Sequence, residues 1–255
     1  MGDLFPIIFP YVCVVLRTTG LVLTSPVFGA RYVPGQVKAG ISLVTGYLMW
    51  ASVPVADLPD SLPAMVAPVL GELVFGLFLG FLTAMVMSAV EMAGQVSDMM
   101  IGFGLSNVID PAQGQSVPVM GTFKHLLITM VFLAMDGHHL FVKGLWESFA
   151  LVPAGGAFIP AEWGEIGLLA FGKMLWAAVI LSCPVWVSAL IVDIALGVMA
   201  RTVPQMNVFV VGMPLKTVVG LGIMSASIAF YGVFTKEIVQ TLSSVFQSLV
   251  GALAR

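Results

Sequence analysis

The sequence predicts an all-α integral membrane-type protein, and three observations support this fold class. Hydrophobic residues make up 59% of the 255 residues and charged residues only 9%, whereas soluble domains carry about 25% charged residues. The mean hydropathy is +1.06. The apolar residues form long runs, and none shows the alternation that indicates a half-buried β-strand. We therefore expect a helical protein with a single domain covering residues 1–255.

Long apolar runs are the expected helical segments. A helix needs about 20 residues to span a bilayer, so some of the runs are long enough and others are not. A shorter run fits a half-helix or one arm of a kinked hairpin, which is tolerated at membrane depth only where protein or a water-filled cavity surrounds it. The lengths thus indicate partner subunits or an internal pathway. The runs lie at about 4–24, 37–55, 67–93, 119–135, 138–152, 166–199, 207–235 and 238–254.

The first run, 4–24, is expected to stay in the protein as a helix. An acidic Asp3 stands where a secretory signal carries Lys or Arg, and no small-x-small cleavage site follows. The next connection, 25–38, carries an Arg and a Lys, whereas the connection 54–63 carries two Asp residues. Because cationic connections tend to stay on the cytoplasmic side, we expect the first connection to be cytoplasmic.

Within the run 67–93, small residues recur at intervals of four and form one stripe down a helical face. Such a stripe lets two helix backbones approach closely in a membrane. Ordinary helix packing is the simpler interpretation, and the alternative adds only that the partner helix belongs to another subunit. The stripe consists of Gly76, Gly80, Ala84 and Ser88.

The stretch 99–118, MMIGFGLSNVIDPAQGQSVP, breaks the apolar pattern after a long predicted helix. Its glycines and prolines favour a compact re-entrant loop over a continued helix. Its apolar side chains would exclude water, and the preceding methionines would fill irregular gaps. A loop of this kind can close a pore. The residues that we assign to such a plug are Gly102, Phe103, Gly104, Leu105, Asn107, Asp110 and Pro111.

The segment MDGHHLF raises the question of a metal site, because Asp136, His138 and His139 are close in sequence. Adjacent His side chains point in different directions on a helix, and no second ligand cluster is apparent, so we expect no metal and no cofactor. The chain also lacks the HExxH, GxSxG and Walker patterns. We therefore expect that the protein is not an enzyme.

The connection 201–216, RTVPQMNVFVVGMPLK, joins two long apolar runs through an unusual set of residues. Pro204 and Pro214 favour a break in a helix, and Gly212 permits a close backbone approach. An Arg and a Lys without any carboxylate favour the cytoplasmic side. We therefore expect a sharp, rigid hairpin tip at 201–216.

Ionisable residues are sparse within or beside the apolar runs. Such groups are costly in a membrane, so each is expected to be paired, to face an aqueous cavity or to lie near an interface. Pairs with neighbouring helices or subunits are the favoured interpretation, and a transporter would instead use some of them as an ion or proton relay. The residues are Arg17, Glu72, Glu91, Asp98, Lys124, Lys173, Asp193, Lys236 and Glu237.

The charge balance excludes nucleic acid as a partner. Ten Lys and Arg residues are scattered singly and are outnumbered by thirteen carboxylates, so the chain has no basic block. The cysteines, Cys13 and Cys183, lie within apolar runs without a CxxC partner and are expected to be small buried hydrophobes.

Several of these stretches together resemble the FliR/SctT family of type III secretion export-gate subunits. They are LRTTGLVLTSPVFGARYVPGQVKAG, GQVSDMMIGFGLSNVIDP, DGHHL and DIALGVMARTVPQMNVFVVGMPLK, and the resemblance runs from near residue 11 to near residue 235. The most specific element is the family's Arg-x-x-Pro-Gln-x-Asn-x-Phe-x-x-Gly-x-Pro pattern. Met213 stands where a Phe is common, which we interpret as a packing change. The pattern is matched by Arg201, Pro204, Gln205, Asn207, Phe209, Gly212 and Pro214.

The resemblance implies that the chain works inside an assembly. One copy would join five FliP-like and four FliQ-like subunits in a helical export gate, in the flagellar basal body of the bacterial inner membrane and in contact with lipid. The gate would be the channel for unfolded flagellar export substrates. Within the chain, about 1–160 would be a FliP-like part and about 161–255 a FliQ-like helical hairpin. Kinked hairpins would lie largely above the membrane plane.

The resemblance also implies roles for two stretches. The loop at about 102–118 would plug the closed pore. The tip would lie at the cytoplasmic entrance, close to an FlhB-like subunit, where it would dock between neighbouring subunits; a well-formed turn without that role is the alternative. The docking residues would be Arg201, Pro204, Gln205, Asn207, Phe209, Gly212, Pro214 and Lys216.

Three other functions stay open as alternatives. The homologous subunit of a virulence injectisome shares most of these motifs. A stand-alone secondary transporter would need similar broken segments in its two halves around a charged midplane site, and we find no convincing repeat of that kind. An intramembrane enzyme would need a nucleophile and a base on facing helices, for which the sequence gives no signal.

Overall fold

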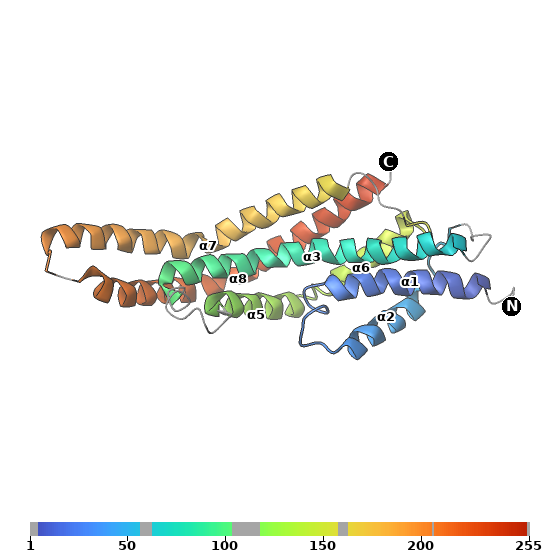
Figure 1. Ribbon diagram of the computed structural model, residues 1–255, viewed down its shortest axis with the longest axis horizontal. Coiled ribbons are helices and arrows are strands. Elements are labelled where there is room, and N and C mark those ends of the chain that lie inside the picture. Colours follow the sequence, from blue (N-terminus) through green and yellow to red (C-terminus); the bar gives the residue numbers. More distant parts are fainter. Residues whose placement is uncertain (1–4, 57–62, 104–117, 158–162, 206, 254–255) are drawn as a thin grey trace. The chain divides into compact units, whose positions relative to one another are not determined.

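Helices form nearly all of the regular structure in the computed structural model, which describes residues 5–56, 63–103, 118–157, 163–205 and 207–253 (Figure 1). Within these ranges the β-structure is one isolated bridge, between Val55 and Ala154. The prediction of an all-α fold is confirmed. In chain order the elements are α1 (Phe5–Thr24), α2 (Gly35–Met49), the 3₁₀-helix η1 (Pro63–Met65), α3 (Val66–Ile101), α5 (Val119–Ala134), α6 (His139–Leu151), α7 (Trp163–Thr202) and α8 (Val208–Leu253).

The long helices extend beyond the apolar runs from which they were predicted. The two runs 207–235 and 238–254 form the single helix α8, because Lys236 and Glu237 interrupt the hydropathy but are both good helix formers. Pro214 also lies inside α8 and does not end it. The predicted break at this proline is therefore wrong, and within the tip α7 ends at Thr202 and α8 begins at Val208.

Three helices in the described ranges are long and apolar enough to cross a membrane. They are α3 together with η1, α7, and residues 208–238 of α8, judged by length and composition. The shorter helices α5 and α6 pass the same test only as a pair, separated by the break at 135–138. The expectation of long helices mixed with broken ones is thus confirmed for a membrane-type fold.

The chain divides into two compact units, and neither is a continuous segment. Unit 1 comprises residues 1–86, 136–172 and 239–255, and unit 2 comprises residues 87–135 and 173–238. The helices α3, α7 and α8 each contribute one part to each unit. Each unit is described separately below.

In unit 1, α1 packs against α3 where glycines remove the side chains between the two backbones. A Cβ atom added at Gly76 would lie 2.0 Å from the backbone oxygen of Arg17, and one added at Gly20 would lie 2.5 Å from the backbone of α3 at Leu73. Gly80 likewise faces the Thr24 hydroxyl. Only glycine allows helices to approach this closely. The helix α2 packs against α1 on another side.

In unit 2, the end of α3 is held by a small apolar core. Ile101, the last residue of α3, is fully buried with Met120, Val185 and Met224, and Phe103 packs against this cluster. These side chains come from α3, α5, α7 and α8. The core therefore joins all four helical segments of the unit around one point.

The helix α5 begins against α3 in the same unit. Both carboxylate oxygens of Asp98 accept hydrogen bonds from the Met120 backbone N–H, at 3.0 and 3.1 Å, and one also accepts from Gly121. Asp98 thus satisfies two of the free N–H groups of the first turn and complements the positive end of the helix dipole. Lys124 donates to the Ser97 hydroxyl at 2.7 Å. Two of the predicted costly charges therefore have partners on a neighbouring helix.

Candidate functional site

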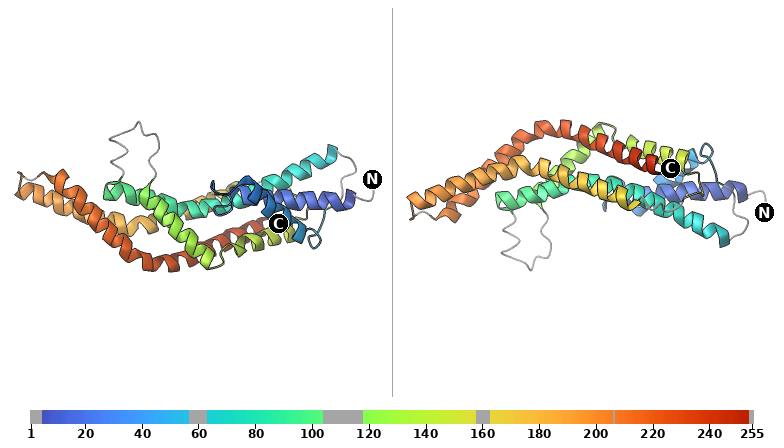
Figure 2. Two further views of the ribbon diagram at one scale, coloured as in Figure 1. Left: turned by 90° about the horizontal axis from the view of Figure 1, so that it is seen from below. Right: turned by 90° about the horizontal axis from the view of Figure 1, so that it is seen from above.

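The connection 203–207 closes the hairpin formed by α7 and α8 in unit 2 (Figure 2). The Asn207 side-chain oxygen accepts hydrogen bonds from the backbone N–H groups of Phe209 at 3.1 Å and Val210 at 3.4 Å. This is the geometry of a helix N-cap, for which Asn is among the preferred residues. Asn207 therefore defines where α8 begins.

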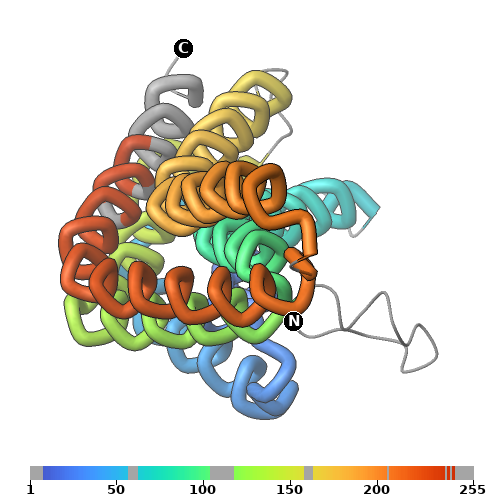
Figure 3. Tube along the Cα trace, turned by 90° about the vertical axis from the view of Figure 1, so that its left-hand side faces the viewer, coloured from blue at the N-terminus to red at the C-terminus, as the bar shows by residue number. Residues whose placement is uncertain are grey.

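The tip residues that were predicted to dock are mostly exposed, and Figure 3 views them end on. Phe209 is 79% exposed, and Val210 beside it is 67% exposed. Large apolar side chains at this exposure indicate a surface that a partner or lipid covers in the assembled state. Arg201, Pro204, Gln205, Asn207 and Pro214 are exposed as well, whereas Gly212 is buried and Lys216 is half-buried.

An ion pair joins the two arms of the hairpin just behind the tip. The Nζ atom of Lys216, on α8, lies 2.5 Å from a carboxylate oxygen of Asp193, on α7. Both side chains are partly exposed, so the pair contributes less to stability than a buried one. Lys216 was predicted as a docking residue, and the structure shows that it also forms an ion pair between α7 and α8.

A pocket of about 390 Å³ lies between the tip and the end of α3. Phe209, Gly212 and Lys216 line it from the tip, and Gly102 lines it from the residue directly after α3. Its remaining lining is largely apolar, from methionines and from α7. The tip and the first of the predicted plug residues are therefore brought together in one unit, although about a hundred residues separate them in the sequence.

The predicted plug begins where α3 ends. Gly102 has a φ of +95°, a backbone conformation that glycine adopts without strain, and this ends the helix. Phe103 packs on the buried core of unit 2. The other five plug residues, Gly104, Leu105, Asn107, Asp110 and Pro111, lie outside the described residues.

Two residues of α8 hold the end of α3, and neither was among the predicted site residues. The Thr217 hydroxyl donates a hydrogen bond to the backbone oxygen of Ile101 at 3.0 Å. A Cβ atom added at Gly220 would lie 2.0 Å from the Ile101 side chain. Their positions three and six residues after Pro214 give no local signal, because the contact depends on how α8 crosses α3.

The first two residues of the predicted stripe on α3 pack against another helix of the same chain. Gly76 and Gly80 are buried against α1, as described above. Ala84 is half-buried, and Ser88 is exposed further along the helix. The partner of the first two glycines is thus a helix of the same chain.

A buried ion pair in unit 1 connects Arg17 with Glu72, and both side chains have no solvent exposure. The guanidinium donates to both carboxylate oxygens, to the Ser148 hydroxyl at 3.2 Å and to the Val152 backbone oxygen at 3.0 Å. Glu72 also accepts a hydrogen bond from the Gly155 backbone N–H at 2.8 Å. The expectation that intramembrane charges form structural pairs is met here.

Aromatic rings complete the surroundings of Arg17. Its guanidinium carbon lies 3.9 Å from the ring centre of Phe149 and 4.6 Å from that of Phe75. A planar guanidinium suits both the bidentate pair and the ring faces, which an ammonium group does not. The site therefore holds α1, α3 and α6 together.

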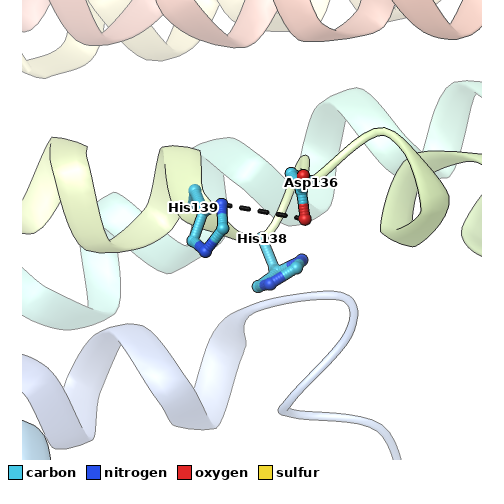
Figure 4. Close-up of side chains that lie close together, drawn as sticks. All are labelled: Asp136, His138 and His139. Carbon is cyan, nitrogen blue, oxygen red and sulfur yellow. Dashed lines mark ion pairs between the residues drawn. The ribbon is translucent and has the colours of Figure 1, made fainter.

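The turn at 136–139 brings Asp136, His138 and His139 together (Figure 4). The rings of the two His residues have centres 4.4 Å apart and are tilted by 39°. The argument that adjacent His side chains diverge is wrong here, because His138 ends the tight turn before α6 and His139 is the first residue of α6, so the pair does not lie in the middle of a helix.

Comparison with known proteins assigns the chain to a family. The sequence pattern of the family described as "Bacterial export proteins, family 1" matches residues 8–242. The flagellar biosynthetic protein FliR of Bacillus subtilis (strain 168) is 34% identical over 223 residues, which cover 85% of this chain and 84% of the relative. The flagellar biosynthetic protein FliR of Escherichia coli (strain K12) is 26% identical over 93% of this chain and 91% of the relative.

A relative with another name matches a shorter part of the chain. The surface presentation of antigens protein SpaR of Shigella sonnei is 30% identical over 154 residues, or 60% of this chain and 59% of the relative. The predicted resemblance is confirmed by the breadth of the family match and by the similarity to FliR. The chain belongs to family 1 of the bacterial export proteins, the FliR/SctT family.

Proposed function

We propose that the chain is a core subunit of the flagellar type III export gate, the channel through which unfolded flagellar proteins leave the cytoplasm. One copy assembles with five FliP-like and four FliQ-like subunits in the bacterial inner membrane, within the flagellar basal body. The family and its FliR members support the export role. The observation that carries the proposal is the pocket where the tip residues Phe209 and Gly212 meet Gly102, since an entrance and a plug must communicate in a gate.

The tip is the proposed docking surface at the cytoplasmic entrance. Its exposed Phe209 offers an apolar anchor, and Arg201 offers a cation at the end of α7. Exposed aromatic and Arg side chains are the residue types that most often dominate protein interfaces. Neighbouring gate subunits and an FlhB-like subunit are the proposed partners.

The segment from Gly102 onward is the proposed plug. Support comes from its anchorage, because the end of α3 is fixed by a buried core and by the hydroxyl of Thr217. A firm base is what a closing segment needs if it is to return to one closed position. In this proposal residues act by sealing and docking, without catalysis.

The proposed division of the chain is a FliP-like part, about 1–160, followed by a FliQ-like hairpin, about 161–255. The helices α7 and α8, which start at Trp163 and are joined by the connection 203–207, support it. Both are continuous in their described residues, whereas an inverted-repeat transporter needs paired broken segments in its two halves. The hairpin therefore favours a gate subunit over a transporter.

Native mass spectrometry tests the proposed function. The protein is extracted in detergent after expression alone and after expression with the FliP-like and FliQ-like proteins of the same organism. We expect one copy in a complex with five and four copies of the partners. A stable monomer or homodimer under both conditions would instead support the transporter.

The flagellar and injectisome functions are separated by complementation. The SpaR relative gives the injectisome a specific basis, although it matches less of the chain than the FliR relatives do. We expect the gene to restore swimming to a flagellar export-gate mutant and not to restore secretion to an injectisome mutant. The reverse pattern would assign the chain to the injectisome.

A further inference from the structure

The turn before α6 gathers three side chains that can bind a metal. Asp136, His138 and His139 each offer one ligand atom, and these atoms all lie within 4.8 Å of one another. All three residues belong to unit 1. In the described part of the chain, this is the one group of three such side chains that converges in this way.

The backbone of the turn explains why the side chains meet. The His139 N–H donates to the Asp136 oxygen at 2.9 Å, and the Phe141 N–H donates to the His138 oxygen at 3.2 Å. Hydrogen bonds between residues three apart wind the chain at about three residues per turn, which places side chains i and i+3 above one another. Asp136 has a φ of 57°, which Asp tolerates better than most residues. Asp136 and His139 therefore face the same side.

The positions of the donor atoms fit a metal ion. The Nδ1 atom of His139 lies 3.8 Å from a carboxylate oxygen of Asp136, and these side chains are 70% and 72% exposed, so an ion can reach them. The Nδ1 atom of His138 is buried and has no hydrogen-bond partner among the residues that the structure describes. A buried nitrogen without a partner is unfavourable, and ligation of a metal ion by the His138 ring gives that ring a partner.

We propose that Asp136, His138 and His139 bind a divalent transition-metal ion, and that Zn²⁺ is a suitable occupant. Two imidazole nitrogens and one carboxylate oxygen form a ligand set that Zn²⁺ accepts in tetrahedral geometry. Ligand atoms in such a site lie roughly 3.3 Å apart. Because the three ligand atoms already lie within 4.8 Å of one another, each pair has to approach by no more than about 1.5 Å. The fourth position is left for water or for a ligand from a neighbouring subunit. The bound ion fixes the turn at 136–139.

The position of the site before a helix makes the carboxylate essential. The N-terminus of α6 carries a partial positive charge, which disfavours a cation. The charge of Asp136 offsets that effect, and the His ligands alone do not. Replacement by Asn tests this directly, because Asn also tolerates a positive φ and keeps the backbone of the turn.

The experiment measures Zn²⁺ binding to the full chain without a His tag, purified in detergent and treated with a chelator. Isothermal titration calorimetry and elemental analysis should give one Zn²⁺ per chain. Asp136→Asn should weaken binding at least tenfold, and His138→Ala with His139→Ala should abolish it. The matched control is His125→Ala, which removes a half-buried His of α5 outside the group and should leave binding unchanged.

The visible spectrum of bound Co²⁺ tests the ligand set in the unaltered protein and does not depend on variants that fold poorly. Intense absorption bands of four-coordinate Co²⁺, weakened by Asp136→Asn, would support the site. Weak octahedral bands, an absence of stoichiometric Zn²⁺, or equal binding by Asp136→Asn and the unaltered protein would each overturn the proposal. Circular dichroism of each variant confirms that the helices are retained.

Discussion

At the residue scale, single side chains hold α1, α3 and α6 together in unit 1. Arg17 donates hydrogen bonds to Glu72, Ser148 and the Val152 backbone oxygen, and all of these residues are buried. Removing one member of a buried pair leaves the other charge without compensation, which costs far more than the pair itself contributes. Glu72 therefore contributes to stability by compensating the buried charge of Arg17.

We therefore predict that Glu72→Gln lowers the free energy of unfolding by about 3–5 kcal/mol, because Arg17 then stays buried without its counter-ion. The measurement is unfolding of the detergent-solubilised chain, followed by tryptophan fluorescence. Lys143→Gln is the matched control, since Lys143 forms an exposed pair with Glu147 at 3.8 Å. The control should change stability by no more than about 0.5 kcal/mol. Equal effects of the two variants would contradict the role of the buried pair.

Asn207 caps the N-terminus of α8. We predict that Asn207→Ala destabilises the start of α8 by about 1 kcal/mol, because the N–H groups of Phe209 and Val210 lose their acceptor. Hydrogen exchange followed by mass spectrometry should show faster exchange confined to the first turn of α8. Asn207→Asp keeps an acceptor and should retain protection. Unchanged exchange in the Ala variant would show that the cap is not needed.

At the element scale, the crossing of α8 over the end of α3 connects the tip with the base of the proposed plug. Thr217 and Gly220 contact Ile101, and Gly212 lines the pocket beside Gly102. These contacts are spaced along one helix that starts at the tip. A displacement of the tip on docking would therefore reach the end of α3 through α8.

We predict that Gly220→Ala disturbs this crossing, because the added Cβ would lie 2.0 Å from the Ile101 side chain. Overpacking of this kind costs about 1–3 kcal/mol. Gly222→Ala is the matched control on the same helix, where a Cβ meets nothing within 4 Å. Swimming speed and complex yield should fall for Gly220→Ala and stay unchanged for Gly222→Ala. Normal swimming speed and complex yield for Gly220→Ala would show that the two helices can shift enough to accept the added Cβ atom.

At the scale of the whole molecule, the apolar surface requires partners or lipid. On α7, Leu190, Ile191, Ile194 and Val198 are at least half exposed within unit 2. Soluble monomers seldom expose such continuous apolar surface. An assembly of the proposed kind would cover it with neighbouring helices.

We predict that replacing residues 104–117 by a short Gly-Ser linker gives an assembled but leaky gate. The proposed plug is removed beyond Phe103, whereas its anchor at Ile101 and the Asp98 contact with α5 are retained. The measurement is small-ion conductance of the purified complex in planar bilayers. A complex that carries Gly222→Ala and is prepared in the same way is the control. Unchanged conductance, with the complex intact, would contradict the assignment of this segment as the plug.

The sequence by itself determined the all-α membrane-type class, the family and the position of the tip. These depend on local properties: hydropathy needs only composition along the chain, and the pattern from Arg201 to Pro214 can be read in order. The sequence-based prediction was less accurate where one residue type is compatible with two structures, as proline is with either a helix break or a position inside a helix. Pro214 was expected to break a helix, and the surrounding apolar run kept it inside α8.

Only the tertiary structure decided which distant residues meet. Three contacts depend on where helices cross or where a turn is tight. They are the ion pair of Arg17 with Glu72, the hydrogen bond from Thr217 to Ile101 and the ring contact between His138 and His139. A crossing is set by the sum of many packing contacts, and no residue near it in sequence reports which side chains face each other. The class of this protein therefore follows from local properties of its sequence, whereas the contacts between distant residues follow from how the helices pack.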